Sequence, residues 1–304
     1  MNRDNLYAIS TSWNYRAHKD AKGMVDELKA LGFERFELNF ALTEEQVNDF
    51  VKLKDAGDIS VTSTHNYCPL PSGVKPKDAS PEYYSLASPD VSERALAVKF
   101  TKRSMDFVKR LEAKVLVMHL GRIDMEDRTR SLFAISDRAR FEKEKEIALG
   151  ERQRLAKPYL SRAMESLKEL LKYAALIGVN LALENRYYIN EMPSLAEFKT
   201  IFNTIDDEHL FYWHDTGHAQ LYENLSIIKH EDLLENLASR LIGVHLHDIM
   251  LFDDHRAPGC GEFDFKRLKP YIKPDTLKVI EAHKIATAEE VKGSLKFLDQ
   301  EMGQ

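Results

Sequence analysis

The stretch that decides the fold is Phe211-Tyr212-Trp213-His214-Asp215-Thr216-Gly217-His218. Here an apolar run ends abruptly in a carboxylate, and an imidazole follows three residues later across a glycine. A buried parallel strand brings polar side chains to the rim of a sheet in this way, and the glycine permits a tight exit. Because a D-x-x-H pattern also occurs in ordinary turns, the stretch is informative only if other strands end similarly.

Strand-like runs and amphipathic helical segments alternate along the whole chain. Strands are predicted over residues 6–10, 36–40, 59–64, 115–118, 179–183, 210–213, 241–246 and 277–280. Helices are predicted over residues 21–31, 92–111 and 159–177, after capping boxes at Thr43, Ser194 and Thr287, and around residues 233–237. Eight such units predict one domain over residues 1–304, an α/β fold of the (β/α)8 TIM-barrel type. An open doubly wound sheet is the alternative, although no glycine-rich phosphate loop follows the first strand.

Residues 122–158 interrupt this alternation after the fourth strand. The segment carries many charges and few periodic apolar residues, and it is much longer than an ordinary connection. We expect a helical insertion, either a solvated excursion or a lid or oligomer contact.

Composition narrows the class of protein. The net charge of −6 and the pI of about 6.0 make nucleic acid an unexpected partner. Two cysteines are too few for a disulfide framework and indicate a reducing compartment. Residues 1–5 lack the apolar core of a secretory signal, and no run of about 18 apolar residues predicts a membrane span. We therefore expect a cytoplasmic protein.

Side chains that can bind metals gather at the predicted strand ends. They are His65, His119, Glu184, Asp215, His218, His245, His247, Asp248 and Glu281. In a barrel these ends meet on one face, where such folds carry out chemistry. Burying so many ionisable groups together is costly unless cations compensate them. Oxygen and imidazole donors without thiolate suit Mg²⁺, Mn²⁺, Co²⁺ or Zn²⁺.

Several of these residues also have simpler readings. His65 is compatible with a loop position and His119 with a satisfied core imidazole. Because His245 and His247 share one parity, one of them suffices as a ligand while the other orients substrate or packs. For Glu37 two roles are open, that of a base behind the ligands and that of a structural acid. Residues 253–261 are expected to form a turn-rich loop, with Asp253 and His255 capable of binding metal.

The chain resembles the xylose-isomerase-like TIM-barrel superfamily, which includes sugar and sugar-phosphate isomerases and epimerases and also endonuclease IV. The resemblance covers nearly the whole chain. It rests on the segments Leu183-Glu184-Asn185, Asp215-Thr216-Gly217-His218, Val244-His245-Leu246-His247-Asp248, Pro258-Gly259-Cys260-Gly261 and Ile280-Glu281-Ala282-His283.

For the epimerase branch, the resemblance implies one divalent ion, Mn²⁺, Mg²⁺ or Co²⁺, held by Glu184, Asp215, His245 and Glu281. It implies proton transfer through a metal-stabilised enediolate, with Glu184 and Glu281 as acid and base. Substrate oxygens would be held by further residues, for which the candidates are His218, Arg256, His65, His119 and Glu37. The substrate would be a small carbohydrate, and a homo-oligomer is expected.

For the endonuclease IV branch, the resemblance implies a phosphodiesterase with three zinc ions and nine ligands. Residues of matching type are His65, His119, Glu184, Asp215, His218, His245, Asp253, His255 and Glu281. The acidic balance and the lack of a basic stripe argue against a DNA-binding surface. A third alternative is a metal-binding barrel without catalysis, which the presence of both Glu184 and Glu281 makes less attractive.

Overall fold

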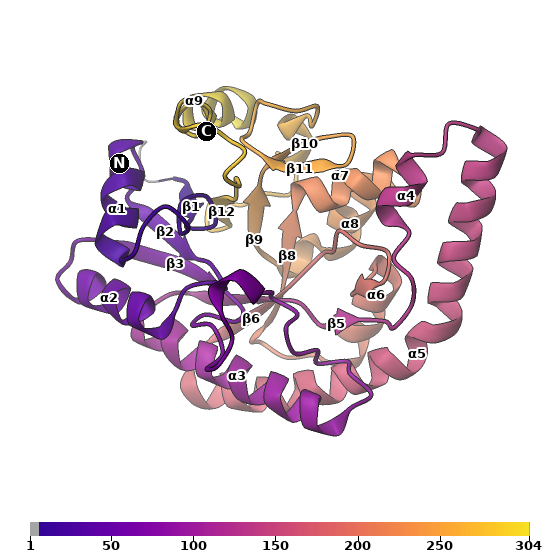
Figure 1. Ribbon diagram of the computed structural model, residues 1–304, viewed down its shortest axis with the longest axis horizontal. Coiled ribbons are helices and arrows are strands. Elements are labelled where there is room, and N and C mark those ends of the chain that lie inside the picture. The colour runs from indigo at the N-terminus through magenta and orange to yellow at the C-terminus, as the bar shows by residue number, and fades with distance from the viewer. Residues whose placement is uncertain (1–5, 304) are drawn as a thin grey trace.

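A closed barrel of eight parallel strands forms the centre of the computed structural model, which describes residues 6–303 (Figure 1). Residues 1–5, the basis of the signal-peptide argument, lie outside the described part. The strands are β1 (Ala8–Ser10), β2 (Arg35–Leu38), β3 (Ser60–His65), β4 (Val115–Met118), β6 (Asn180–Glu184), β8 (Leu210–Asp215), β9 (Leu241–Leu246) and β12 (Leu277–Ile280). Each pairs with its neighbours in chain order, and β12 closes on β1. The predicted (β/α)8 barrel is confirmed.

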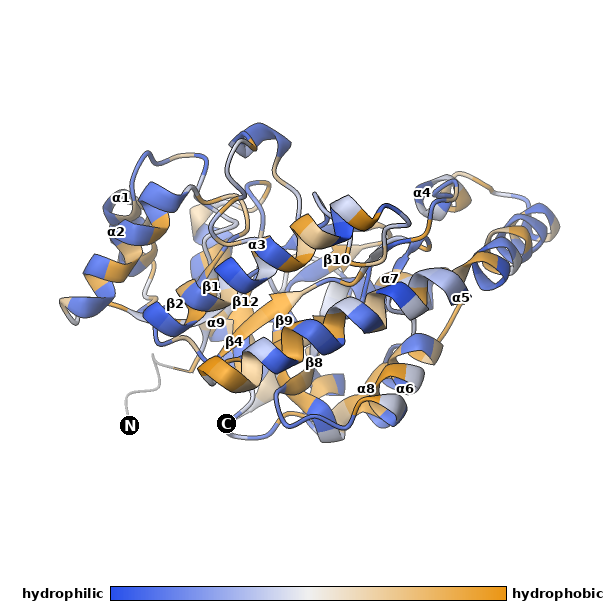
Figure 2. Cartoon of the chain, turned by 90° about the horizontal axis from the view of Figure 1, so that it is seen from below, coloured by the Kyte–Doolittle hydropathy of each residue, from blue (hydrophilic) through white to orange (hydrophobic). Residues whose placement is uncertain are grey.

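Helices surround the barrel, and three of them begin at capping boxes that the sequence predicted. They are α1 (Ala21–Ala30), α2 (Glu44–Asp55), α3 (Val91–Arg110), α6 (Leu195–Thr204), α7 (Thr216–Asn224), α8 (His230–Leu237) and α9 (Ala288–Met302). The three predicted capping boxes, at Thr43, Ser194 and Thr287, are all formed. Figure 2 shows that hydrophobic residues dominate the barrel strands, whereas the outer helices alternate in hydropathy. No helix among the described residues is both long and apolar enough to cross a membrane.

The segment after β4 differs from its prediction. It contains the short helix α4 (Thr129–Phe133) and then α5, a single helix from Arg138 to Ile177. The predicted boundary at residue 158 is therefore wrong, because α5 runs through Pro158. An interior proline removes one backbone hydrogen bond and crowds the carbonyl four residues earlier, yet the helix continues through Pro158, which lies on its exposed side. The first half of α5 buries few residues, which explains its weak apolar periodicity.

Two small antiparallel sheets stand beyond the barrel strands and were not predicted. One pairs β5 (Gly121–Arg122) with β7 (Glu191–Met192), and the other pairs β10 (Asp248–Met250) with β11 (Asp253–Arg256). The expectation of an irregular loop after the seventh strand is thus wrong over β11. Short 3₁₀ segments, η2 (Pro76–Asp78), η3 (Ala238–Arg240) and η4 (Phe265–Leu268), complete the connections.

An apolar plug fills the barrel below the polar rim. It is built from Ala8, Val115, Val117, Ala182, Trp213, Leu277 and Val279. The Trp213 ring takes the space of a side chain at Gly243, where an added Cβ would lie 2.1 Å from Cζ3 of the indole. The centroids of the Trp213 and His245 rings are 5.0 Å apart. The tryptophan therefore forms part of the floor on which the polar site rests.

Candidate metal centre

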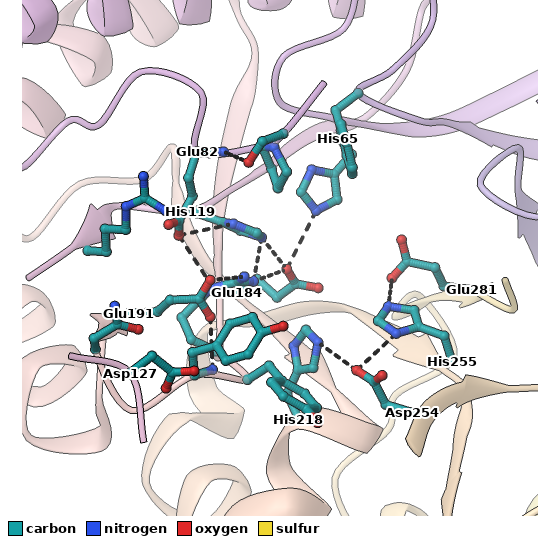
Figure 3. A pocket seen from close by; sticks show the side chains of 18 of the residues that line it. His65, Glu82, His119, Asp127, Glu184, Glu191, His218, Asp254, His255 and Glu281 are labelled. Carbon is teal, nitrogen blue, oxygen red and sulfur yellow. Dashed lines mark hydrogen bonds and ion pairs between the residues drawn. The ribbon is translucent and has the colours of Figure 1, made fainter. Parts of the chain in front are cut away.

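The carboxyl ends of the barrel strands bring the predicted polar side chains together (Figure 3). His65 and Glu184 are the last residues of β3 and β6, while His119 and Glu281 follow β4 and β12. All four line a cavity of about 580 Å³, and His218 from α7 lines it as well. The structure thus brings these five residues, all near strand ends, around one cavity.

Four ligand-type atoms converge beneath this cavity. Glu184, Asp215, His245 and Glu281 each offer one such atom, and the four atoms lie within 4.8 Å of one another. Nδ1 of His245 lies 2.5 Å from Oε1 of Glu184, 3.0 Å from Oε2 of Glu281 and 3.8 Å from Oδ2 of Asp215. Ligands of a single ion, each about 2.0–2.2 Å from it, have this mutual spacing. Three carboxylates and one imidazole therefore fit a hard or borderline divalent cation.

The opposite nitrogen of His245 is held by Glu37. Nε2 lies 3.0 Å from Oε1 of Glu37, and Ser63 donates a 2.7 Å hydrogen bond to Oε2 of the same carboxylate. Glu37 is completely buried. A carboxylate that accepts the second N–H of a histidine fixes its tautomer and its ring orientation. Glu37 therefore acts on His245 and lies beneath it, away from the cavity surface.

The pKa values of the two central glutamates move in opposite directions. Burial raises the pKa of Glu184, but His245 and His119 outweigh this and hold it well below its ordinary value. At Glu281 burial dominates, and the pKa is raised. Such separation within one cluster is typical of functional sites.

Asp215 also organises the start of α7. Its Oδ1 accepts a 2.8 Å hydrogen bond from the backbone N–H of His218, as an N-cap does. Nε2 of His247 lies 2.9 Å from the same carboxylate. Gly217 is required here because an added Cβ would lie 2.1 Å from Cε1 of His247. The glycine in the opening motif therefore makes room for an imidazole, whereas the sequence suggested a tight turn.

The second oxygen of Glu184 faces a different set of groups. Nε2 of His119 lies 2.8 Å from Oε2, Nε2 of His65 lies 3.5 Å from it, and Nη1 of Arg186 lies 2.9 Å from it. Nη1 of Arg186 also contacts Nε2 of His119. Burial and the nearby guanidinium lower the pKa of His119 to about 3, so its imidazole is neutral.

The hairpin of β10 and β11 supplies the far wall of the cavity (Figure 3). Oδ2 of Asp254 lies 3.0 Å from Nδ1 of His255 and 3.8 Å from Nε2 of His218. Burial lowers the pKa of His255, but Asp254 outweighs it and the value rises to about 9. His255 thus reaches the site, as the sequence suggested.

Asp253 and Arg256 do not reach the site, and Asp254 takes the place that the sequence gave to Asp253. Asp253 is instead paired with Arg256. An extra residue interrupts the β10–β11 register, and His255 has a φ of 55°, in the left-handed region. This bulge breaks the alternation of side chains, so that Asp254 and His255 both face the cavity. Nothing in the sequence marks the position of the bulge.

Two other functional candidates escaped the sequence argument. Arg186 stands two residues after Glu184, and Glu82 comes from the loop between β3 and α3. Both side chains are buried and line the cavity. An arginine so close to a predicted ligand was a usable signal for the first, whereas Glu82 lies in a proline-rich loop without periodicity.

Comparison with known proteins agrees with this architecture. A family model described as xylose isomerase-like TIM barrel matches residues 25–300. The chain belongs to this family. No curated protein sequence matches it.

Similar solved structures share the barrel over almost its whole length. A D-tagatose 3-epimerase-like protein superposes with a TM-score of 0.70 at 18% identity, covering 97% of this chain and 96% of the other. The 3-keto-D-glucoside 4-epimerase of E. coli gives a TM-score of 0.70 at 18% identity, covering 97% and 99%. D-psicose 3-epimerase from Clostridium cellulolyticum H10 superposes with a TM-score of 0.67 at 16% identity, covering 97% of this chain and 99% of the other. At these identities the likeness establishes the fold.

Proposed function

We propose that this xylose isomerase-like barrel is a divalent-metal-dependent isomerase or epimerase of small sugars or sugar phosphates. The observation that carries the proposal is the convergence of Glu184, Asp215, His245 and Glu281 within 4.8 Å below an accessible cavity. Supporting it, the structures that share the fold include proteins named as 3-epimerases and a 4-epimerase of sugars. A metal-binding barrel without chemistry accounts less well for two glutamates beside the same cavity.

The four converging residues would hold one Mn²⁺, Mg²⁺ or Co²⁺. When bound, the ion supplies Lewis-acid polarisation of the substrate's carbonyl and neighbouring hydroxyl. His245 is held ready for this by Glu37. The aliphatic and aromatic floor around Trp213 keeps bulk water away from the ligands from below.

Glu184 and Glu281 approach the cavity from different strands, β6 and β12. Both side chains are almost fully buried and line the cavity. One glutamate removes a proton from the carbon beside the carbonyl, and the other delivers a proton, which inverts the centre or moves the carbonyl. His65, His119 and His218 line the same cavity and are placed to hold substrate oxygens, whereas Arg256 is engaged with Asp253.

Exchange of a carbon-bound proton tests this proposal. We expect the Mn²⁺-loaded chain, incubated in deuterated water with D-fructose, D-tagatose, D-psicose or L-ribulose, to incorporate deuterium beside the carbonyl, as seen by NMR. Glu184→Gln and Glu281→Gln should each reduce the exchange rate to background, because each removes a proton carrier and also a ligand of the ion that would polarise the carbonyl. A rate like that of the wild type in either variant would contradict the mechanism.

A zinc-dependent phosphodiesterase is the second candidate. It is favoured by two further groups of ligand-type side chains in or beside the cavity, namely His65 with His119 and Glu184, and Asp215 with His218, His247 and His255. Cleavage of a duplex that contains an abasic site, with about three zinc ions per chain, would establish it in place of the isomerase.

The expected setting is the cytoplasm. Both cysteines, Cys68 and Cys260, are free, which suits a reducing compartment. Fractionation of cells that express the tagged chain tests this location.

A further inference from the structure

The positively charged side chain of Arg186 lies beside Glu184. His65, His119 and Glu184 form a group of three ligand-type side chains whose donor atoms lie within 4.8 Å of one another. Arg186 lies among them, with its Nη1 at 2.9 Å from Oε2 of Glu184 and in contact with Nε2 of His119. The guanidinium thus contacts two of the three atoms that a metal ion would need.

The guanidinium is locked in this position. Arg186 is 7% exposed, its Nη2 lies 3.2 Å from Oε1 of Glu191, and its Nε lies 3.8 Å from Oε1 of Glu82. A buried guanidinium is stable only when carboxylates surround it, and arginine remains charged at any physiological pH. Three carboxylates, those of Glu82, Glu184 and Glu191, supply that surrounding.

We propose that Arg186 keeps a metal ion out of the group formed by His65, His119 and Glu184, and thereby limits the number of ions that the chain binds. An ion bound to His119 and Glu184 must approach both atoms within about 2.2 Å. Nη1 already contacts both atoms, and its positive charge repels a second cation at that range. Arg186 thus takes the place of an ion and leaves Oε1 of Glu184 to the four-ligand centre.

This inference rests on the proposed function, in which Glu184 is a metal ligand, and deepens it. A second ion on Oε2 would make Glu184 a bridge between two metals, the arrangement suited to clamping a phosphoryl group. A fixed guanidinium on Oε2 leaves a single ion at Glu184. Arg186 therefore selects carbonyl chemistry over phosphoester hydrolysis.

The test counts Mn²⁺ ions in four full-length proteins. Each is stripped with a chelator and dialysed against excess Mn²⁺, and bound metal is measured by mass spectrometry. Removing the guanidinium leaves three carboxylates uncompensated, so Arg186→Met should bind one ion more than the wild type. The double variant Arg186→Met/His65→Ala should return to the wild-type number, which locates the extra ion. His65→Ala alone should match the wild type, because no ion depends on His65 while Arg186 is present.

Two results would overturn the inference. The first is a folded Arg186→Met chain, checked by circular dichroism, that binds the wild-type number of ions. The second is a loss of one ion in His65→Ala alone, which decides the question even if Arg186→Met does not fold. Failure of the proposed function would give a different result. In that case Asp215→Asn would bind as many Mn²⁺ ions as the wild type.

Discussion

Glu184 uses its two carboxylate oxygens for different purposes. Oε1 faces His245 at 2.5 Å, on the side where Asp215 and Glu281 converge, whereas Oε2 faces Arg186 and two histidines. A single carboxylate therefore belongs to a metal-type cluster and to an internal ion pair. The chemistry that we propose depends on this division, because a free Oε2 would invite another ion.

Glu37 should tune the metal affinity without touching the metal. Glu37→Gln keeps the shape of the side chain but weakens the acceptor for Nε2 of His245. Loss of such a partner typically reduces metal affinity about 10- to 100-fold. We expect this decrease in a Mn²⁺ competition titration against a fluorescent chelator. Ser63→Ala removes a hydrogen bond to Glu37 but leaves the carboxylate in place, so it should have a smaller effect. An unchanged affinity in Glu37→Gln would show that metal binding by His245 does not depend on Glu37.

Gly217 should be intolerant of even a methyl group. In Gly217→Ala the new Cβ would meet the completely buried ring of His247 at 2.1 Å, so the ring must shift away from Asp215. Overpacking of this kind costs about 1–3 kcal/mol. Thermal denaturation should show a lower Tm together with weaker Mn²⁺ binding. The matched control is Gly293→Ala on α9, where an added Cβ would meet nothing within 4 Å outside its own stretch of helix. An equal loss of stability there would contradict the explanation.

The sequence predicted the converging residues for a simple reason. Each lies within one residue of the end of a strand, and a barrel brings such positions to one face. Asp254 was missed because the left-handed φ of His255 rotates the chain at a place that no residue type marks. Arg186 was missed although its place two residues after Glu184 was a signal, because arginine side chains are mostly exposed and its burial is visible only in the structure.

At the scale of helices and strands, local signals were reliable where the interactions are local. Capping boxes join residues three apart, and all three predicted boxes are formed. The pair β5–β7 was missed because tertiary structure brings its two distant strands together. The hairpin β10–β11 is local, but it was missed because its short strands, Asp248–Met250 and Asp253–Arg256, lack an apolar alternation and contain a bulge. The start of α5 was missed because its first half projects from the barrel and has little apolar pattern to read.

An ion-pair clamp joins three neighbouring elements outside the barrel. Arg267 of η4 donates hydrogen bonds to Glu223 of α7, at 2.7 Å, and to Glu231 of α8, at 2.6 Å. These bonds to Arg267 lower the pKa of both glutamates. A carboxylate with a lowered pKa contributes stability above its unfolded pKa, near 4.3, and loses that contribution as the pH falls through its folded value.

The stability difference between the wild type and Arg267→Met should therefore depend on pH. We expect the wild type to have the higher Tm at pH 7 and the gap to narrow as the pH falls below about 4. Scanning calorimetry of both proteins across this pH range measures the difference in Tm. Arg154→Met on α5, where the arginine is exposed and forms no ion pair with a described residue, should show no such trend. A gap that widens on acidification would contradict the assignment.

At the scale of the whole molecule, the barrel makes the site. Glu184, Asp215, His245 and Glu281 are far apart in the sequence, and only closure of the sheet brings their ligand atoms within 4.8 Å. The apolar plug inside the barrel stabilises the fold, and the polar side chains above it line the cavity. Without compensation by a cation, so many buried carboxylates would repel one another.

Anomalous diffraction from crystals grown with Mn²⁺ tests the central claim most directly, because it locates the ion among named side chains. The account predicts an anomalous peak surrounded by Glu184, Asp215, His245 and Glu281, and none bound to both His65 and His119. An absence of Mn²⁺ from the four-residue cluster at saturating concentration would contradict it.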